Sequence, residues 1–471
     1  MHIGYTWKVI FTLFGAVSVT GLPDISSETL GMKWHTRDVI TRDIAIIGGG
    51  ASGTYAAIRL GDLNQSVILV ERKDRLGGHT ETYTDPATGI NIELGVLEYH
   101  NISLVTNFFA RFNIPLTSAS ESSPPGLIQD VVDFRTGKIV TGYTPSDPTA
   151  ALGIYTSQVA QYPYLETGFD LPDPVPADLF LPFGDFITKY NISAAANLIF
   201  EFNQGAGDFL QVPTIYIMKL LTLSVLQGIQ TGFLTTANHD NSQLYEKAEA
   251  VLAAANALLL SSHVIACERD NTGVKIAVLT PSGPKLILAK KVLVTMPPTL
   301  YNMQPFELDN TELGIFRQFS ASGYYTGLIR NSGIPDNVDF QNIGSNTPFN
   351  LPALPGLYSI DPTGVPGLHQ FLYGSPTVLT NEQVQNNVLA SVKQLRSAGT
   401  LNTTTPEFVV FSSHSPFLMT VPSEAIKNGF YRNLTGLQGH RSTYYTGATF
   451  HTHDSSLLWQ FTEALLPKLA A

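Results

Sequence analysis

Three glycines with the spacing Gly48-x-Gly50-x-x-Gly53 are the residues of this chain best suited to bind a nucleotide diphosphate. Gly48 permits a tight turn, Gly50 lets a ligand approach the backbone, and Gly53 allows a helix to pack closely on a strand. The N-terminus of that helix would present free N–H groups and a partial positive charge to the phosphates. A glycine turn that binds no ligand is the alternative, because such turns are common.

An acidic residue stands at the distance that dinucleotide binding requires. Glu71 lies 18 residues after Gly53, at the end of a second apolar run, where its carboxylate can accept hydrogen bonds from ribose hydroxyls. A carboxylate at this place disfavours a 2′-phosphate, so the pattern argues against NADP. Ala51 and Ser52, inside the turn, and Arg72, directly after the acid, are further candidates for cofactor contact.

The elements that position these groups can be predicted from the hydropathy pattern. Residues 43–47 form a β-branched run typical of a buried parallel strand, residues 55–60 follow a helical pattern, and residues 66–70 form a second strand. Strand, glycine turn, helix and strand within about 30 residues make a βαβ unit. We therefore expect an α/β protein with a Rossmann-type domain.

A second glycine pair indicates which dinucleotide to expect. Gly77-Gly78-His79 follows Glu71 after five residues, and this arrangement resembles the flavoproteins of the amine oxidase superfamily. The resemblance implies FAD, with the glycine pair against its pyrophosphate. The superfamily usually has arginine after the glycines, where this chain has His79. This departure weakens a direct equation with ordinary amine oxidases.

Further segments resemble the same superfamily and extend the expected cofactor site. They correspond to a strand beside the adenine, a stretch that approaches the isoalloxazine, a strand that leads to the ribityl chain, and the cap of the last helix. The residues that the resemblance adds to the site are Gly95, Val96, Val264, Gly447, Ala448 and Ser455. The capped helix N-terminus at residues 454–456 could stabilise negative charge on the reduced flavin.

The nearest resemblance within the superfamily is to the fungal β-cyclopiazonate dehydrogenase group. It is carried by residues 48–60, 75–83 and 85–89, and by the terminal pattern Ser455-Ser456-x-Leu458-Trp459-x-Phe461. It implies a two-domain flavoprotein in which FAD-binding segments alternate with segments of a substrate domain. The expected FAD-binding segments are 42–149, 261–300 and 431–471, and the expected substrate-domain segments are 150–260 and 301–430.

The expected reaction is an oxidation that uses FAD alone. We find no second Gly-x-Gly-x-x-Gly for a nicotinamide cofactor, so a small substrate should pass a hydride to flavin N5, and oxygen or another acceptor should reoxidise the flavin. The bond oxidised would be a C–H bond next to nitrogen or within a conjugated system. The resemblance adds oxidative ring closure of a secondary metabolite. An amine or polyamine oxidase is the rival enzyme, and an FAD-binding protein without turnover is the rival of another class.

The candidate catalytic residues come from segments expected to pass the flavin. The resemblance places residues 93–96 at the isoalloxazine, so the side chains that follow could face the substrate, and two tyrosines before Gly447 could form part of an aromatic wall. The candidates are Glu98, Tyr99, His100, Tyr444 and Tyr445. His100 could act as a general base, with an exposed or structural histidine as the alternative. Core packing is the alternative for the three tyrosines.

Several histidines raise two further possibilities. His79 lies close to the expected pyrophosphate, which argues against reach to the flavin 8α-methyl, so a noncovalent contact is expected there. His451 and His453 are weak candidates for a covalent tether. The spacing of His414, His440, His451 and His453 matches no common metal-binding pattern, so no metal is expected.

Composition limits the partners of the chain. The formal net charge is −11 and no run of lysine and arginine stands out, which argues against nucleic acid. The single cysteine, Cys267, excludes an intramolecular disulfide. The sequence leaves the oligomeric state open.

The N-terminus predicts a secreted protein. Lys8 and the short apolar run 9–19 are typical of a secretory signal peptide, expected at residues 1–21. The run is too short to cross a bilayer, so no membrane span is expected in the mature protein. A signal anchor or a mitochondrial presequence is the alternative. Export also fits the Asn-X-Ser/Thr sequons at Asn64, Asn101, Asn191, Asn402 and Asn433.

Overall fold

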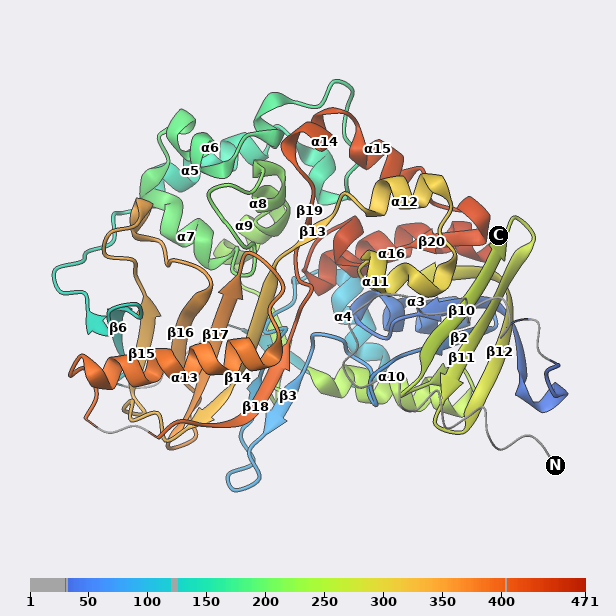
Figure 1. Cartoon of the computed structure of the whole chain (residues 1–471), viewed down its shortest axis with the longest axis horizontal. Coiled ribbons are helices and arrows are strands. Elements are labelled where there is room, and N and C mark those ends of the chain that lie inside the picture. The colour runs from blue at the N-terminus through green and yellow to red at the C-terminus, as the bar shows by residue number, and fades with distance from the viewer. Residues whose placement is uncertain (1–29, 31–32, 120–125, 403–404) are drawn as a thin grey trace.

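The computed structural model describes residues 30, 33–119, 126–402 and 405–471. Two lobes lie side by side, each built on a seven-stranded sheet (Figure 1). The predicted signal peptide, residues 1–21, lies outside the described residues. Within the described part of the chain, no helix combines the length and the hydrophobicity that crossing a bilayer requires.

The first sheet contains the predicted βαβ unit. Its strands run in the order β10 (His263–Asp270), β11 (Gly273–Thr280), β12 (Gly283–Val294), β1 (Val39–Ile47), β2 (Val67–Val70) and β9 (Leu258–Leu259), and β20 (Thr443–Tyr445) also pairs with β12. Strands β12, β1, β2, β9 and β20 are parallel, whereas β10 and β11 extend β12 in antiparallel fashion. The expected α/β class with a Rossmann-type domain is confirmed.

The sequence of β1 explains why this sheet is buried on both faces. Successive side chains of a strand point to opposite faces. Ala45 and Ile47 accordingly pack into one hydrophobic cluster, and Ile44 and Ile46 into another. The second cluster also joins the helices α3 (Ala51–Asp62), α4 (Ser103–Arg111), α10 (Ser242–Ala254) and α16 (Ser455–Ala470).

The second sheet is mostly antiparallel. Its strands run in the order β18 (Glu407–Ser413), β14 (Gly323–Arg330), β17 (Leu368–Ser375), β16 (Gly356–Pro362), β15 (Val338–Asn342), β6 (Ile128–Asp133) and β7 (Lys138–Ile139). Helix α13 (Asn381–Ser397) lies across this sheet (Figure 1). Its helical spacing of Val384, Val388, Val392 and Leu395 explains the contact, because all four side chains are buried in one cluster with the sheet.

The remaining elements cap the second sheet and connect the lobes. A group of helices gathers at one end of the second sheet (Figure 1): α5 (Thr149–Val159), α6 (Phe183–Tyr190), α7 (Ala196–Glu201), α8 (Thr214–Leu220) and α9 (Leu223–Thr231). The other short helices are α11 (Leu300–Met303), α12 (Asn310–Phe316), α14 (Ser423–Lys427) and α15 (Phe430–Thr435). Three small two-stranded sheets pair β3 (Thr82–Thr84) with β4 (Asn91–Glu93), β5 (Leu116–Ser118) with β8 (Leu234–Thr236), and β13 (Ser320–Ala321) with β19 (Met419–Thr420).

Strand pairing moves two of the expected domain boundaries. β6 and β7 fall in the expected FAD-binding segment 42–149, but β6 pairs with β15 and therefore belongs to the second sheet. α10 and β9 fall in the expected substrate-domain segment 150–260, but β9 pairs with β2 and α10 packs with α3 in the first lobe. Both differences arise from contacts between distant parts of the chain, which the local hydropathy pattern does not encode.

Candidate functional site

The glycine turn lies at the carboxyl end of β1 and leads directly into α3. Gly48 has a φ of +108°, a conformation that residues with a side chain rarely adopt. A Cβ atom on Gly53 would lie 1.9 Å from the carbonyl oxygen of Gly48, so only glycine lets the helix pack this closely on the strand. Gly50 gives α3 no capping side chain, which leaves the first N–H groups of the helix for an anion.

The second glycine pair lies against the first turn. The Gly77 N–H donates to the Gly49 carbonyl at 2.9 Å, and a Cβ atom on Gly78 would lie 2.8 Å from the Cα of Gly50. The two glycine segments therefore form one surface of bare backbone, which a pyrophosphate can approach closely.

Glu71 is buried at the end of β2, beside this surface. Its Oε2 accepts a hydrogen bond from the Gly49 N–H at 2.6 Å, and its Oε1 accepts one from the Lys73 N–H at 2.7 Å. These bonds fix the carboxylate, and each oxygen keeps a second lone pair for a ribose hydroxyl. The Ser262 N–H donates to the Glu71 carbonyl at 2.9 Å, which brings the start of β10, and with it Val264, to the same end of the sheet. Arg72 is exposed.

Four buried hydroxyl groups around these turns make no hydrogen bond of normal geometry. They belong to Ser52, Thr80, Tyr99 and Tyr245. Ser52 lies in the first turn of α3, and a Cβ atom on Gly77 would lie 3.3 Å from the Tyr245 ring. Leaving a buried hydroxyl without a partner costs about 1–3 kcal/mol, so these groups indicate a polar ligand. The pyrophosphate and ribityl chain of FAD fit this combination of bare backbone and unpaired hydroxyls.

The carboxyl ends of β1, β12 and β20 converge on the turn. The Thr295 hydroxyl, directly after β12, donates to the Gly48 carbonyl at 3.0 Å. A Cβ atom on Gly447, two residues after the end of β20, would lie 2.7 Å from the Thr295 carbonyl oxygen. Ala448 follows at the start of a short 3-10 helix. The structure thus brings predicted cofactor residues from both ends of the chain to one place.

The N-terminus of α16 is capped by Asp454, whose Oδ1 accepts the Leu457 N–H at 2.9 Å. The Oδ2 of Asp454 lies 3.0 Å from the Nε2 of His100, and the His100 N–H donates to the Ser456 hydroxyl at 3.0 Å. Burial by itself lowers the pKa of His100, but the hydrogen bond and charge of Asp454 outweigh burial and raise it. Because His100 is bonded twice to the first turn of α16, which also holds the buried Ser455, this geometry favours the structural alternative for His100.

This pair predicts a pH-dependent stability. Because the folded-state pKa of His100 is raised, the pair stabilises the fold fully below the unfolded-state pKa of about 6.5, and this stabilisation is lost as the pH rises through the folded-state pKa. Asp454→Asn keeps an oxygen for the helix cap but removes the charge. We expect urea unfolding to show that Asp454→Asn lowers the free energy of unfolding by about 1.5–3 kcal/mol at acidic pH, and by less at alkaline pH. An equal loss at both pH values would contradict the assignment.

The two C-terminal tyrosines do not form the expected aromatic wall. The Tyr445 hydroxyl donates to the Oε1 of buried Glu312 at 3.0 Å, and the Tyr444 ring lies 5.8 Å from the Nζ of Lys291. Strand alternation in β20 turns one ring into the interior and the other toward the opposite side of the sheet, so both are packing residues. Glu98 is exposed.

A group of stacked rings lies beside the stretch 93–96, and we call it the imidazole cluster. The ring centroids of His79 and His414 are 4.5 Å apart, and those of Phe417 and His453 are 3.9 Å apart. Tyr324 packs on Phe417 at 5.1 Å. The cluster consists of His79, Tyr324, His414, Phe417 and His453.

Gly95 joins the imidazole cluster to the cofactor-binding segments. A Cβ atom on Gly95 would lie 1.7 Å from the His79 carbonyl oxygen and 3.2 Å from the His414 ring, so this stretch lies against the backbone of His79 and the ring of His414. Sequence reasoning considered His414 only as a metal ligand and missed Phe417 and Tyr324. No local pattern marks them, because Tyr324 near the start of β14 and Phe417 in the segment between β18 and β19 meet only in the folded chain.

The imidazole cluster carries no charge at neutral pH. Burial lowers the pKa of His414 to about 3 and that of His453 to about 4. Burial, with the neighbouring His414, also holds the pKa of His79 well below its usual value. The Nε2 atom of His453 is buried without a hydrogen-bond partner, so it can bond to a polar atom of a ligand.

A buried lysine that the sequence did not indicate joins α8 to the C-terminal segment. The Nζ of Lys219 donates to the Leu165 carbonyl at 2.6 Å and contacts the Nδ1 of His451. Burial lowers the pKa of Lys219 and of His451 well below their usual values. Lys219 therefore links the substrate-domain helices to the segment that follows Gly447.

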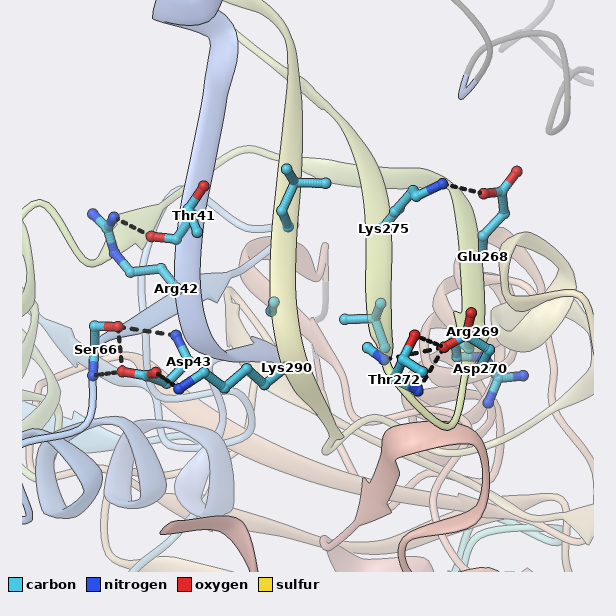
Figure 2. A pocket seen from close by; sticks show the side chains of 14 residues that line it. Thr41, Arg42, Asp43, Ser66, Glu268, Arg269, Asp270, Thr272, Lys275 and Lys290 are labelled. Atoms are coloured by element: carbon cyan, nitrogen blue, oxygen red, sulfur yellow. Dashed lines mark hydrogen bonds and ion pairs between the residues drawn. The ribbon is translucent and has the colours of Figure 1, made fainter. Parts of the chain in front are cut away.

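A surface groove of about 430 Å³ lies on the first sheet, lined by residues of β1, β10, β11 and β12 (Figure 2). Both of its lysines are paired with carboxylates of the groove: Lys290 with Asp43 at 2.7 Å, and Lys275 with Glu268 at 3.3 Å. The groove meets β1 at residues 41–43, whereas nucleotides bind beyond the carboxyl ends of parallel strands. This groove is therefore separate from the cofactor site.

Comparison with solved structures shows the fold. The CLA-producing fatty acid isomerase from P. acnes superposes with a TM-score of 0.72 at 19% identity, over 91% of this chain and 98% of that one. Putrescine oxidase bound to putrescine superposes with a TM-score of 0.61 at 14% identity, over 91% of this chain and 99% of that one. The expected amine oxidase-like architecture is confirmed.

Comparison with curated proteins shows the family. Residues 46–112 match the family described as NAD(P)-binding Rossmann-like domain. The chain is 41% identical over 470 residues to the FAD-dependent oxidoreductase oblC of Cochliobolus heterostrophus, over 97% of this chain and 96% of that protein. It is 33% identical over 456 residues to beta-cyclopiazonate dehydrogenase of Aspergillus oryzae, over 96% of this chain and 98% of that protein. The expected cofactor, FAD, and the expected enzyme class, an oxidoreductase, are confirmed. The chain belongs to the family of fungal FAD-dependent oxidoreductases that includes beta-cyclopiazonate dehydrogenase.

Proposed function

We propose that this enzyme dehydrogenates or oxidatively cyclises a small, uncharged substrate that contains an aromatic or conjugated system. Bound FAD supplies an acceptor for the hydride of a C–H bond at its N5 atom. One relative is named for the dehydrogenation of beta-cyclopiazonate, which supports a secondary metabolite as substrate. The observation that carries the proposal is the uncharged imidazole cluster beside Gly95.

The imidazole cluster suits a neutral ring better than a cation. A planar substrate can stack on imidazole and phenyl faces, and the unpaired Nε2 of His453 can bond to a heteroatom that orients it. A diamine would need carboxylates, because a buried cation without a counter-charge is strongly destabilised. His79, His414 and His453 offer the diamine no such charge, because an imidazole is neutral or cationic and never supplies a negative counter-charge. The cluster therefore favours this proposal over a polyamine oxidase.

Anaerobic reduction of the flavin tests the proposal. Indoline is a neutral aromatic compound with a C–H bond next to nitrogen, and putrescine is a dication of similar size. We expect indoline to bleach the flavin absorbance of the purified holoenzyme and to yield indole, and we expect putrescine to leave the spectrum unchanged. Bleaching by putrescine alone would favour the amine oxidase. No bleaching across a panel of neutral cyclic amines and conjugated C–H donors would favour an FAD-binding protein without turnover.

We also propose that the protein is exported. The predicted signal peptide supports export, and so does the exposure of every sequon asparagine: Asn64, Asn101, Asn191, Asn402 and Asn433. Asn101 is exposed although it directly follows the buried His100. Mass analysis of the protein from culture medium, before and after N-glycosidase treatment, should show cleavage near residue 21 and a loss of glycan mass. Retention in the cells with an intact N-terminus would contradict export.

A further inference from the structure

A chain of hydrogen bonds connects the imidazole cluster to the surface of the protein. The Nε2 of His414 lies 3.3 Å from the Ser412 hydroxyl, and this hydroxyl donates to the Oε2 of Glu81 at 2.8 Å. His414 and Ser412 are buried, whereas the Glu81 side chain is 27% exposed and bonds to Arg75 at 2.7 Å. The chain of bonds thus begins in the interior and ends at solvent.

The chemistry of these groups gives the hydrogen bonds a direction. A serine hydroxyl has one proton, and Ser412 gives it to a carboxylate, which only accepts. The Ser412 oxygen must therefore accept from His414, whose Nε2 carries the ring proton. A neutral imidazole has one N–H, so the Nδ1 of His414 keeps its lone pair and can act as a base.

His414 is held in place at the site. His414 directly follows the last residue of β18, and its backbone N–H donates to the Tyr324 carbonyl at 2.9 Å. Its ring lies against Gly95 and stacks on His79. A protonatable nitrogen is therefore fixed beside the stretch that approaches the cofactor, with a path to solvent behind it.

We propose that His414, Ser412 and Glu81 carry the proton that the substrate loses during oxidation from the buried site to solvent. The proposal rests on the proposed function, because a dehydrogenation releases a proton as well as a hydride. With indoline, the C2–H bond breaks and its electron pair leaves with the hydride to FAD. The N1–H bond also breaks, and its electrons form the C2=N1 bond while the proton goes to the Nδ1 of His414; the resulting 3H-indole tautomerises to indole by moving a proton from C3 to N1. The Nε2 proton then passes to Ser412, the Ser412 proton passes to Glu81, and Glu81 releases it to water.

The charged and titratable groups around His414 are compatible with this path. Burial, followed by the charges of Lys73, His453 and Arg75, lowers the pKa of His414 to about 3. These groups keep the ring neutral before it receives the proton and favour rapid transfer onward to the carboxylate of Glu81. His414 is the group expected to touch the substrate, and Ser412 acts through it.

The first test reads the tautomer of His414 and needs no substrate. In holoenzyme labelled with nitrogen-15 histidine, the His414 signals are assigned by their loss in His414→Gln. We expect a neutral ring with a proton on Nε2 at neutral pH, and we expect Ser412→Ala to change the Nε2 signal, whereas Ser413→Ala on the other side of the same strand should not. A proton on Nδ1, or an imidazolium ring, would overturn the proposal.

The second test follows proton release and flavin bleaching separately after anaerobic mixing with indoline and a pH indicator dye. In the wild type and Ser413→Ala, the two signals should coincide. In Ser412→Ala, we expect proton release to slow by roughly a hundredfold or more and to be partly restored by added imidazole. Proton release at the wild-type rate would overturn the relay, whereas failure of indoline to bleach the wild type would count against the proposed function and leave the relay to be decided by the tautomer.

Discussion

Replacing Gly53 by alanine is expected to abolish tight FAD binding and to destabilise the fold by about 1–3 kcal/mol or more. The added Cβ would lie 1.9 Å from the Gly48 carbonyl oxygen and 3.0 Å from the Thr295 hydroxyl. Backbone cannot move aside as a flexible side chain can, so α3 must shift away from β1. The shift would move the helix N–H groups away from the pyrophosphate. The visible spectrum of the purified protein and its thermal unfolding measure the two effects.

Gly61 provides a matched control in the same helix. A Cβ atom there meets no atom within 4 Å, and alanine is favoured over glycine in a helix by about 0.8–1.0 kcal/mol. Gly61→Ala should therefore bind FAD as the wild type does and unfold at the same or a higher temperature. If Gly53→Ala were as yellow and as stable as Gly61→Ala, the close approach of α3 to the strand would have no role in cofactor binding.

The second large effect is expected from Glu312→Gln, which should cost about 3–5 kcal/mol of stability. Arg269 and Glu312 form an ion pair at 2.7 Å, and both side chains are fully buried. Glutamine would leave the Arg269 guanidinium without its counter-charge, and a buried unpaired charge is strongly destabilising. Arg269 also bonds to the Thr443 hydroxyl at 3.0 Å, so the pair ties β10 to β20 beneath the site.

The pH dependence of this ion pair follows from the pKa of Glu312. Burial alone raises the pKa of Glu312, but the hydrogen bond and charge of Arg269 outweigh burial and lower it. A lowered pKa means that the stabilisation is present above the unfolded-state value of about 4.3 and is lost as the pH falls through the folded-state pKa. The difference in unfolding free energy between the wild type and Glu312→Gln should therefore shrink as the pH falls below about 4.

An exposed ion pair of the same sheet serves as the control. Lys275 and Glu268 lie 3.3 Å apart with both side chains largely exposed, so Glu268→Gln should change stability by about 1 kcal/mol or less. Equal effects of the two substitutions in urea unfolding would contradict the role assigned to the buried pair.

Asp309 and His440 approach Glu312 closely enough to suggest a metal site, but Arg269 and Arg441 already bond the Glu312 oxygens.

Local sequence determined the nucleotide-binding half of the site. The spacing of Gly48, Gly50 and Gly53, the buried β-branched strand before them and Glu71 after them each act within a short stretch of chain. Their periodicity and conformational requirements are set by covalent geometry, so they can be read without knowing the rest of the fold. The resemblance of the second glycine pair to flavoproteins then indicated FAD.

Tertiary structure alone decided which side chains face one another. Ser412 and Glu81 are 331 residues apart and bond directly, β6 crosses into the second sheet, and Tyr445 turns inward to Glu312. None of these outcomes has a local signal, because each depends on which distant strands pair and on which face of a strand a side chain falls. A one-residue change of register would reverse that face. The sequence by itself therefore determined the cofactor and the fold class, and the way in which the two lobes come together decided which side chains of distant segments meet.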